Sequence, residues 1–263
     1  MPIWSRRVDR ATDDVFALQD HIVGSIVGAL EPGLRRAEIE RLRQRPTQSP
    51  SAYAAYQRAV ACMHPLTPDN SIAALALLDE ALAIDPNFAL ALATAAQCRM
   101  WRVSQDFAAD VPSELAEAIR LLEAALARST DDPYVLAQAG AIFAYLGYRR
   151  DIAATLADRA VDLHPNSAFT RTTAGWVYLF EDGPSTAIEH FEVALRLDPV
   201  DPGAGLWLAG ISYAHLMAGH LEAAMRWGER AIAASPEMLS AHRAYVAALG
   251  SAGVRGAGVI DDH

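Results

Sequence analysis

Lysine is absent from this chain of 263 residues, so arginine supplies all 22 of its basic side chains. Without lysine, the chain cannot build a P-loop, a Schiff base or a lysine general base. Cysteine is nearly absent as well, with only Cys62 and Cys98 present. These two lie 36 positions apart, which excludes a disulfide framework and a zinc-binding spacing. We expect both cysteines to be small buried hydrophobic side chains.

The motifs of common catalytic and cofactor sites are also missing. The sequence contains no GxSxG, HExxH, CxxC or EF-hand loop. Its two GxG fragments, at 203–205 and 256–258, lack a third glycine and a preceding strand, which argues against a dinucleotide site. His215 and His220 are five residues apart, not the four that place a metal-binding pair on one helix face. We therefore predict that the chain is not an enzyme and holds no cofactor and no metal.

Long apolar runs are lacking too. The most apolar stretch, 71–86, is interrupted by Asp79, Glu80 and Asp85, so it cannot span a bilayer. The N-terminal residues contain no apolar core of signal-peptide length. The net charge of −10 divides into +1 over residues 1–48 and −11 over residues 49–263, and an acidic body repels phosphate backbones. We expect a cytoplasmic protein that binds neither nucleic acid nor membrane.

What the sequence does contain is a repeat, in which an alanine-rich amphipathic run ends on a proline. Successive prolines of this phrase are 47, 32, 34 and 37 residues apart, at Pro86, Pro133, Pro165, Pro199 and Pro236. The last three spacings cluster near 34, and the first needs an insertion, which Val103–Pro112 supplies. Alanines seven residues apart lie on one helix face, where another helix can approach closely. Proline then ends one helix and begins the next, so each unit is predicted to be a pair of helices.

These units closely resemble the tetratricopeptide repeat, and the resemblance covers about 51–250. The best unit, 168–199, has the signature residues Gly175, Tyr178, Ala187, Phe191, Ala194 and Pro199. The unit after it has Gly210, Tyr213, Ala224, Ala231 and Pro236, and the unit before it has Gly140, Phe143, Gly147, Ala153, Ala160 and Pro165. The resemblance implies an all-α fold, a right-handed α-solenoid of helix-turn-helix repeats with an N-terminal helical extension. The alternative is an ordinary helical bundle.

Four segments follow from this pattern. We predict a frayed or extended segment over 1–11 and a helical junction over 12–48, where Val15, Leu18, Ile22 and Ile26 form one apolar stripe. The solenoid is predicted over 49–250, as about five repeats plus an unpaired helix. Residues 251–263 show no helical pattern and are predicted to be a disordered tail, which would leave the last helix poorly protected.

The junction carries a second resemblance. The run from Asp13 to Arg41, entered by IWSRRVDR, resembles a junction in bacterial multidomain signalling proteins. Those proteins are class III adenylate or guanylate cyclases, or winged-helix transcriptional regulators, with an effector domain before the junction and a repeat array after it. We expect this chain to lack the effector domain, because the metal-binding and nucleotide-recognition residues of a cyclase have no counterpart in it.

The resemblance implies a protein–protein interaction scaffold, the regulatory arm of a bacterial signalling protein. Two alternatives stay open, a trans-acting regulatory subunit of an adenylate or guanylate cyclase and a truncated remnant without present function. The family's concave groove would bind a protein or peptide, and self-association is open. A carboxylate clamp for chaperone C-termini is disfavoured, because it needs lysines.

Family positions place nine side chains towards that groove. Partly exposed aromatic side chains commonly dominate the energy of peptide binding. The alternative for Trp176 and Trp207 is that they pack between repeats. The nine candidates are Tyr56, Gln97, Trp101, Tyr145, Phe169, Trp176, Phe180, Trp207 and His215.

Overall fold

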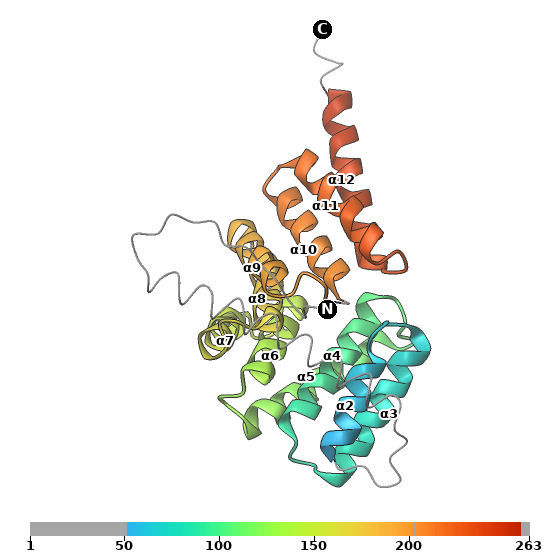
Figure 1. Cartoon of the computed structure of the whole chain (residues 1–263), viewed down its shortest axis with the longest axis vertical. Coiled ribbons are helices and arrows are strands. Elements are labelled where there is room, and N and C mark those ends of the chain that lie inside the picture. Colours follow the sequence, from blue (N-terminus) through green and yellow to red (C-terminus); the bar gives the residue numbers. More distant parts are fainter. Residues whose placement is uncertain (1–51, 202, 259–263) are drawn as a thin grey trace, which may run out of the picture.

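A computed structural model describes residues 52–201 and 203–258 of the chain. The segments predicted over 1–11 and 12–48 lie outside the described residues. Every regular element within the described ranges is a helix (Figure 1). These helices are α2 (Ala52–Cys62), α3 (Pro68–Ile84), α4 (Ala89–Ser104), α5 (Val111–Arg128), α6 (Pro133–Leu146), α7 (Arg150–Leu163), α8 (Ala168–Phe180), α9 (Pro184–Leu197), α10 (Ala204–Met217), α11 (Leu221–Ala234) and α12 (Leu239–Gly258).

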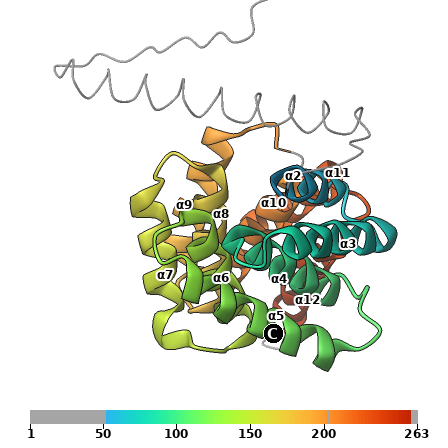
Figure 2. The same cartoon turned by 90° about the horizontal axis from the view of Figure 1, so that it is seen from below.

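The helices pack as consecutive hairpins. The most extensive contacts join α2 to α3, α4 to α5, α6 to α7, α8 to α9 and α10 to α11. Each first helix from α4 onwards also contacts the first helix of the next hairpin, in the order α4, α6, α8, α10 and α12. Figures 1 and 2 show the hairpins following one another around a superhelical path. The predicted all-α solenoid of helical repeats is confirmed.

Local sequence signals set where these helices begin and end. The Asp132 carboxylate accepts hydrogen bonds from the backbone N–H groups of Tyr134 and Val135 at 2.8 and 3.2 Å, and so caps α6. Gly147 ends α6 with a φ of 63°, in the left-handed region that favours glycine. Between α8 and α9 the arrangement differs, because Gly183 has a φ of −112° and the preceding Asp182 takes the positive φ of 61°.

A close contact between two repeats is built on Phe191. Its ring is fully buried and lies between the backbones of Gly175 on α8 and Gly210 on α10. A Cβ atom on Gly175 would come within 2.8 Å of that ring, and one on Gly210 within 2.5 Å. Real Cβ atoms essentially never approach so closely, so the ring fills a space that only glycine leaves open. Three signature residues of two different repeats therefore form one packing unit.

Tyrosine–carboxylate hydrogen bonds link neighbouring hairpins on their outer side. Tyr178 Oη on α8 donates to Asp158 Oδ1 on α7 at 2.7 Å, and burial together with this bond raises the pKa of Tyr178 to about 12. Tyr148 makes the same type of bond to Glu123 at 2.6 Å. In each case a tyrosine in or just after a first helix reaches back to the preceding second helix, which adds a polar link to the apolar packing.

The second repeat departs from the others in the segment where the insertion was expected. There α4 runs to Ser104, a short loop turns at Asp106 with a φ of 63°, and α5 begins at Val111. The Glu114 carboxylate accepts from Arg99 Nη1 at 2.7 Å and from Arg102 Nε at 2.9 Å. These three side chains are only 12 to 23% exposed, so they form a largely buried ionic cluster between α4 and α5.

The last helix is longer than the sequence predicted. Helix α12 continues to Gly258, so 251–258 are helical rather than part of a disordered tail. The first part of α12 packs against α10 and α11 through a face of small residues, in which Ala241, Ala244 and Ala248 are fully buried. With no proline after this face, nothing in the sequence stops the helix at 250.

The helices of the array do not include a membrane span. No helix within 52–201 and 203–258 is both long enough and apolar enough to cross a bilayer.

Candidate binding face

Three of the predicted site residues lie in a continuous row on α6 and α8. The ring centroids of Tyr145 and Phe180 are 5.5 Å apart, edge to face, and those of Phe180 and Trp176 are 5.8 Å apart and stacked. We call Tyr145, Trp176 and Phe180 the aromatic triad. Trp176 also meets the ring of Phe191 edge to face at 5.6 Å. The triad thus extends from the buried Phe191 outwards to Tyr145, which is 36% exposed.

Hydrogen bonds from Arg150 fix the end of α8, which carries Phe180. Arg150 at the start of α7 donates from Nη2 to the carbonyl oxygen of Phe180 at 3.1 Å. Its Nε donates to the Glu181 carboxylate, also at 3.1 Å. A helix end left with free carbonyl groups would fray. Arg150 satisfies one of these groups and so restricts the backbone that carries Phe180.

Polar side chains lie on the same first helices. Gln138 on α6 is 4% exposed, and its Nε2 donates to Thr94 Oγ1 at 3.2 Å and to Gln97 Oε1 at 3.0 Å. Its Oε1 is buried and has no hydrogen-bond partner among the described residues. The same holds for Thr172 Oγ1 and for the indole Nε1 of Trp176. Buried polar atoms without partners are uncommon, because each costs about 1–3 kcal/mol.

The other predicted site residues are dispersed among separate contacts. Trp101 lies 6.2 Å from the ring of His64, Tyr56 lies 5.2 Å from Phe88, and Phe169 lies 5.5 Å from Tyr134. All three predicted residues are half-buried, and none of these contacts joins one of them to the aromatic triad.

Gln97 and Trp207 have little surface to offer a partner in this structure. Gln97 is 7% exposed and engaged with Gln138, while Trp207 is 6% exposed and belongs to the core cluster around Phe191. His215 is half-buried beside His220, with ring centroids 5.7 Å apart. Burial lowers the pKa of the His215 imidazole, and the neighbouring His220 adds to this effect.

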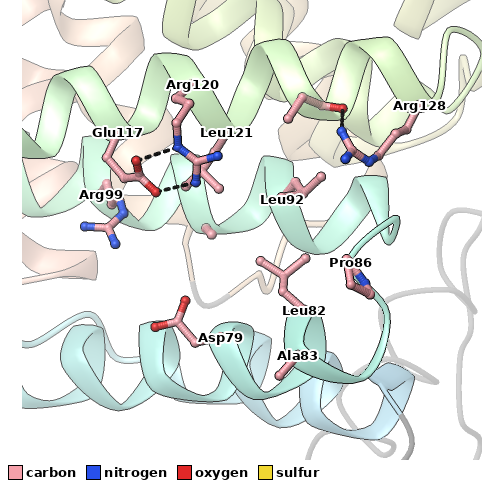
Figure 3. Close-up of a pocket in the computed structure, with 12 residues that line it drawn as sticks. Asp79, Leu82, Ala83, Pro86, Leu92, Arg99, Glu117, Arg120, Leu121 and Arg128 are labelled. Carbon is pink, nitrogen blue, oxygen red and sulfur yellow. Dashed lines mark hydrogen bonds and ion pairs between the residues drawn. The ribbon is translucent and has the colours of Figure 1, made fainter.

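A separate cavity of about 390 Å³ lies between α3, α4 and α5. Figure 3 shows Leu82 and Asp79 of α3 facing Arg120 and Glu117 of α5 across it, with Leu92 of α4 between them. Arg120 donates to both oxygens of Glu117, at 2.6 and 2.7 Å. This ion pair lowers the pKa of the Glu117 carboxyl. Arg120 at the mouth is therefore already paired within the protein.

Comparison with known proteins identifies the fold of this chain from solved structures and a relative of it from sequence. No protein-family model matches the chain. The crystal structure of TTC0263, a thermophilic TPR protein of Thermus thermophilus, superposes with a TM-score of 0.55 at 20% identity, over 76% of this chain and 99% of that one. The chain has the tetratricopeptide-repeat fold. The structure of PilW, a type IV pilus biogenesis factor, aligns with a TM-score of 0.49 at 17% identity, over 76% of this chain and 89% of that one.

Among curated proteins, a relative of this tetratricopeptide-repeat chain is "Putative adenylate cyclase 3" of Rhizobium meliloti (strain 1021). The two are 31% identical over 140 residues, which is 52% of this chain. The match spans 24% of the relative, so about three quarters of that protein lies outside the alignment.

Gln138 and Thr94 form a hydrogen-bonded polar pair, and neither residue is among the nine predicted ones. The register of the repeats explains why these two residues meet. Gln138 lies two residues before the signature Gly140, and Thr94 lies two residues before Ala96, the equivalent position in the preceding repeat. Equivalent positions of adjacent tetratricopeptide repeats lie side by side, and these two side chains are hydrogen-bonded. Comparing the repeats position by position could therefore have identified this pair. It was missed because the candidates were chosen mainly for their aromatic rings.

Proposed function

We propose that this chain is a non-catalytic scaffold that binds a protein segment across the aromatic triad. The observation that carries the proposal is the row itself: three aromatic rings in contact, continuous with the core at Phe191, and ending on Tyr145 at 36% exposure. Rigid aromatic side chains lose little conformational entropy on binding, and such side chains dominate the energy of many interfaces. The predicted protein–protein interaction role thus falls on one definite part of the array.

The partner segment is proposed to be apolar and uncharged where it contacts the triad. The triad side chains carry no charge, and the nearest charged side chain in the hydrogen-bond network, Arg150, is already paired with Glu181. The indole Nε1 of Trp176 is buried, so it offers the partner no hydrogen bond in this structure. An apolar side chain lying on Tyr145 and Phe180 fits this uncharged surface.

The test uses peptide binders selected from a displayed random library against the full chain. Binding by the selected peptides is then measured by calorimetry on the Tyr145→Ala and Phe180→Ala variants. We expect affinity to fall about tenfold or more, as for residues at the centre of an interface. The matched control is Tyr53→Ala, because Tyr53 is 61% exposed on α2 and lies outside the triad. Binders that lose as much affinity on Tyr53→Ala as on Tyr145→Ala would sink the proposal.

A second candidate function is regulation of a nucleotide cyclase. The match to the Rhizobium meliloti protein favours it, since that alignment covers half of this chain. The test adds purified chain to that relative and to a version of it lacking the matched 140 residues, and measures cyclic nucleotide formation. A change in rate for the shortened relative, abolished by Tyr145→Ala in the added chain, supports regulation through the triad. Equal rates with and without the added chain count against it.

A further inference from the structure

The end of α4 is hydrogen-bonded to the beginning of α12, far away in the sequence. Gln105 Nε2 donates to Ser240 Oγ at 2.7 Å, and Gln105 Oε1 accepts from the backbone N–H of Leu239 at 3.1 Å. Arg243 Nη1 donates to the carbonyl oxygen of Ser104 at 2.8 Å. We call these five residues the clasp. The bonded partners are separated by 134 to 139 positions in the sequence.

Gln105 occupies the place of a helix cap. Leu239 is the first residue of α12, so its N–H has no acceptor within the helix. An N-cap side chain usually comes from the residue just before a helix, whereas here it comes from the second repeat. Gln105 is 8% exposed and uses both ends of its amide, as a buried polar group should. It also lies within the insertion Val103–Pro112 that interrupts the repeat spacing.

The clasp closes a circuit of first helices. Helices α4, α6, α8, α10 and α12 each contact the next one in this order, and the clasp joins α12 back to α4. Figure 1 shows the path running from α2 and α3 at the lower right, past α7 at the left, and back to α12 at the upper right. Because the first helices are linked all the way round, the array cannot lengthen or unwind between α4 and α12 without breaking these hydrogen bonds.

The closed circuit leaves polar groups of its own helices unsatisfied. Three side-chain atoms on α6 and α8 are buried and have no hydrogen-bond partner within 52–201 and 203–258. They are Gln138 Oε1 on α6 and Thr172 Oγ1 and Trp176 Nε1 on α8. Gln138 lies between two first helices, since it donates to Thr94 and Gln97 on α4, so separating α4 from α6 would hydrate its amide. The clasp acts in the opposite direction, since it stabilises the wound array through the α12 cap. Two opposing contributions of this kind allow a wound and an opened state of similar free energy.

We propose that the clasp is a switch that holds the repeat array wound and limits access to the aromatic triad. When the clasp opens, the first helices separate, and the Gln138 amide becomes available to a partner's main chain. The control of access to the triad rests on the proposed function, whereas the holding of the array in its wound form concerns the free protein alone. A partner that binds the opened array more tightly would shift the population towards it.

The free protein is tested first, with Gln105→Ala in the full chain. Loss of the cap should speed amide exchange over 239–243 by about fivefold to tenfold, judging from the usual cost of removing an N-cap. The radius of gyration from small-angle scattering should increase. The matched control is Gln57→Ala, because the Gln57 amide donates to Tyr53 Oη within α2. Exchange over 239–243 and a radius equal to those of Gln57→Ala would overturn the clasp.

A conservative variant separates the cap from general destabilisation. Gln105→Glu keeps an acceptor at the positive end of α12, where a carboxylate is favoured, and should restore slow exchange over 239–243. Faster exchange spread over every helix in Gln105→Ala, with no restoration by Gln105→Glu, would show a general loss of stability and overturn the switch.

Binding is tested second, with peptides already shown to depend on Tyr145. Such peptides should associate at least about threefold faster with Gln105→Ala than with Gln57→Ala, because the opened state is more populated. Unchanged association on a measurably expanded Gln105→Ala protein would overturn the control of access, while the clasp itself and the role of the triad would stand. If no selected peptide depends on Tyr145, the proposed function fails, and the scattering and exchange results still decide the clasp.

Discussion

The second and fourth repeats share one hairpin design but fasten it to their surroundings in different ways. In the fourth repeat, α8 and α9, the buried ring of Phe191 lies between Gly175 and Gly210, and the contact is purely apolar. In the second repeat, α4 and α5 are joined near the loop between them by the ionic cluster of Arg99, Arg102 and Glu114. The comparison shows that the tetratricopeptide fold fixes where helices lie, while individual repeats differ in what holds them there.

The difference also separates two roles. The apolar fourth repeat continues outwards into Phe180 and Tyr145, so its packing and the proposed binding face form one unit. The charged second repeat positions the end of α4, and there Gln105 caps α12. Arg102 contributes to this directly, because its Nη1 also donates to Ser71 Oγ on α3 at 2.7 Å. The fourth repeat, together with Tyr145 of the third, would therefore bind, and the second repeat would control how the array is closed.

The largest effect is expected from emptying the space between Gly175 and Gly210. Phe191→Ala removes a fully buried ring and leaves a cavity that two glycine-lined helices cannot easily fill. Such truncations cost about 3–5 kcal/mol of the free energy of unfolding. Urea denaturation followed by circular dichroism measures this cost. Leu163→Ala, at a site that is 38% exposed, serves as the control and should change stability by no more than about 0.5 kcal/mol.

The same variant tests the continuity of core and binding face. Trp176 loses its edge-to-face contact with Phe191, so the triad should become less ordered and triad-dependent peptides should bind more weakly. If Phe191→Ala unfolds as easily as Leu163→Ala does, the ring is not the central contact of the fourth repeat.

A smaller loss is expected from the ionic cluster of the second repeat. Glu114→Gln removes the charge that two arginines share, and hydrogen bonds to charged groups contribute about 1.5–3 kcal/mol when largely buried. Denaturation by urea again gives the value. The control within the same repeat is Arg120→Ala, since the Arg120 side chain is 64% exposed and its pair with Glu117 should contribute at most about 0.5 kcal/mol.

Equal losses for Glu114→Gln and Arg120→Ala would mean that the cluster is as weak as a surface ion pair. The second repeat would then be held by its leucine and alanine packing alone, and the contrast with the fourth repeat would disappear.

The sequence predicted those parts of the fold that depend on short-range patterns. The spacing of seven between alanines predicted the buried helix faces, and the proline that follows predicted the helix ends. Both predictions depend only on residues close together in the sequence. The contact of Phe191 with Gly175 and Gly210 was implicit, since all three occupy signature positions. The boundary at 250 was wrong because the glycine-containing sequence was taken as non-helical, whereas α12 continues to Gly258 and no proline after Ala248 ends it.

The site was harder to predict than the fold. The spacing of four between Trp176 and Phe180 on α8 predicts their contact, but no local pattern said that Tyr145 of α6 would join them. That depends on the curvature of the array, which sums small rotations over many repeats. The clasp depends on the same sum, because Gln105 and Ser240 meet only after the path has turned through the intervening repeats.

The smallest expected effect is a loss of stability at acid pH that arises from His190 in the fourth repeat. In the fourth repeat, the His190 imidazole stacks on the Tyr178 ring at 5.5 Å, and burial lowers its pKa, with the Arg171 charge acting in the same direction. Asp158 and Glu189 oppose this shift without cancelling it. The unfolded chain therefore binds a proton below about pH 6.5 more readily than the folded chain does. The contribution of His190 to stability is present above that pH and is lost as the pH falls through the lower folded value.

Thermal melts between about pH 7 and pH 5 should show a smaller decrease of melting temperature for His190→Gln than for the unchanged protein. His242→Gln, at an exposed position on α12, should leave the decrease as it is. If both variants behave alike, the acid sensitivity does not arise from His190, and the fourth repeat owes none of it to this buried imidazole.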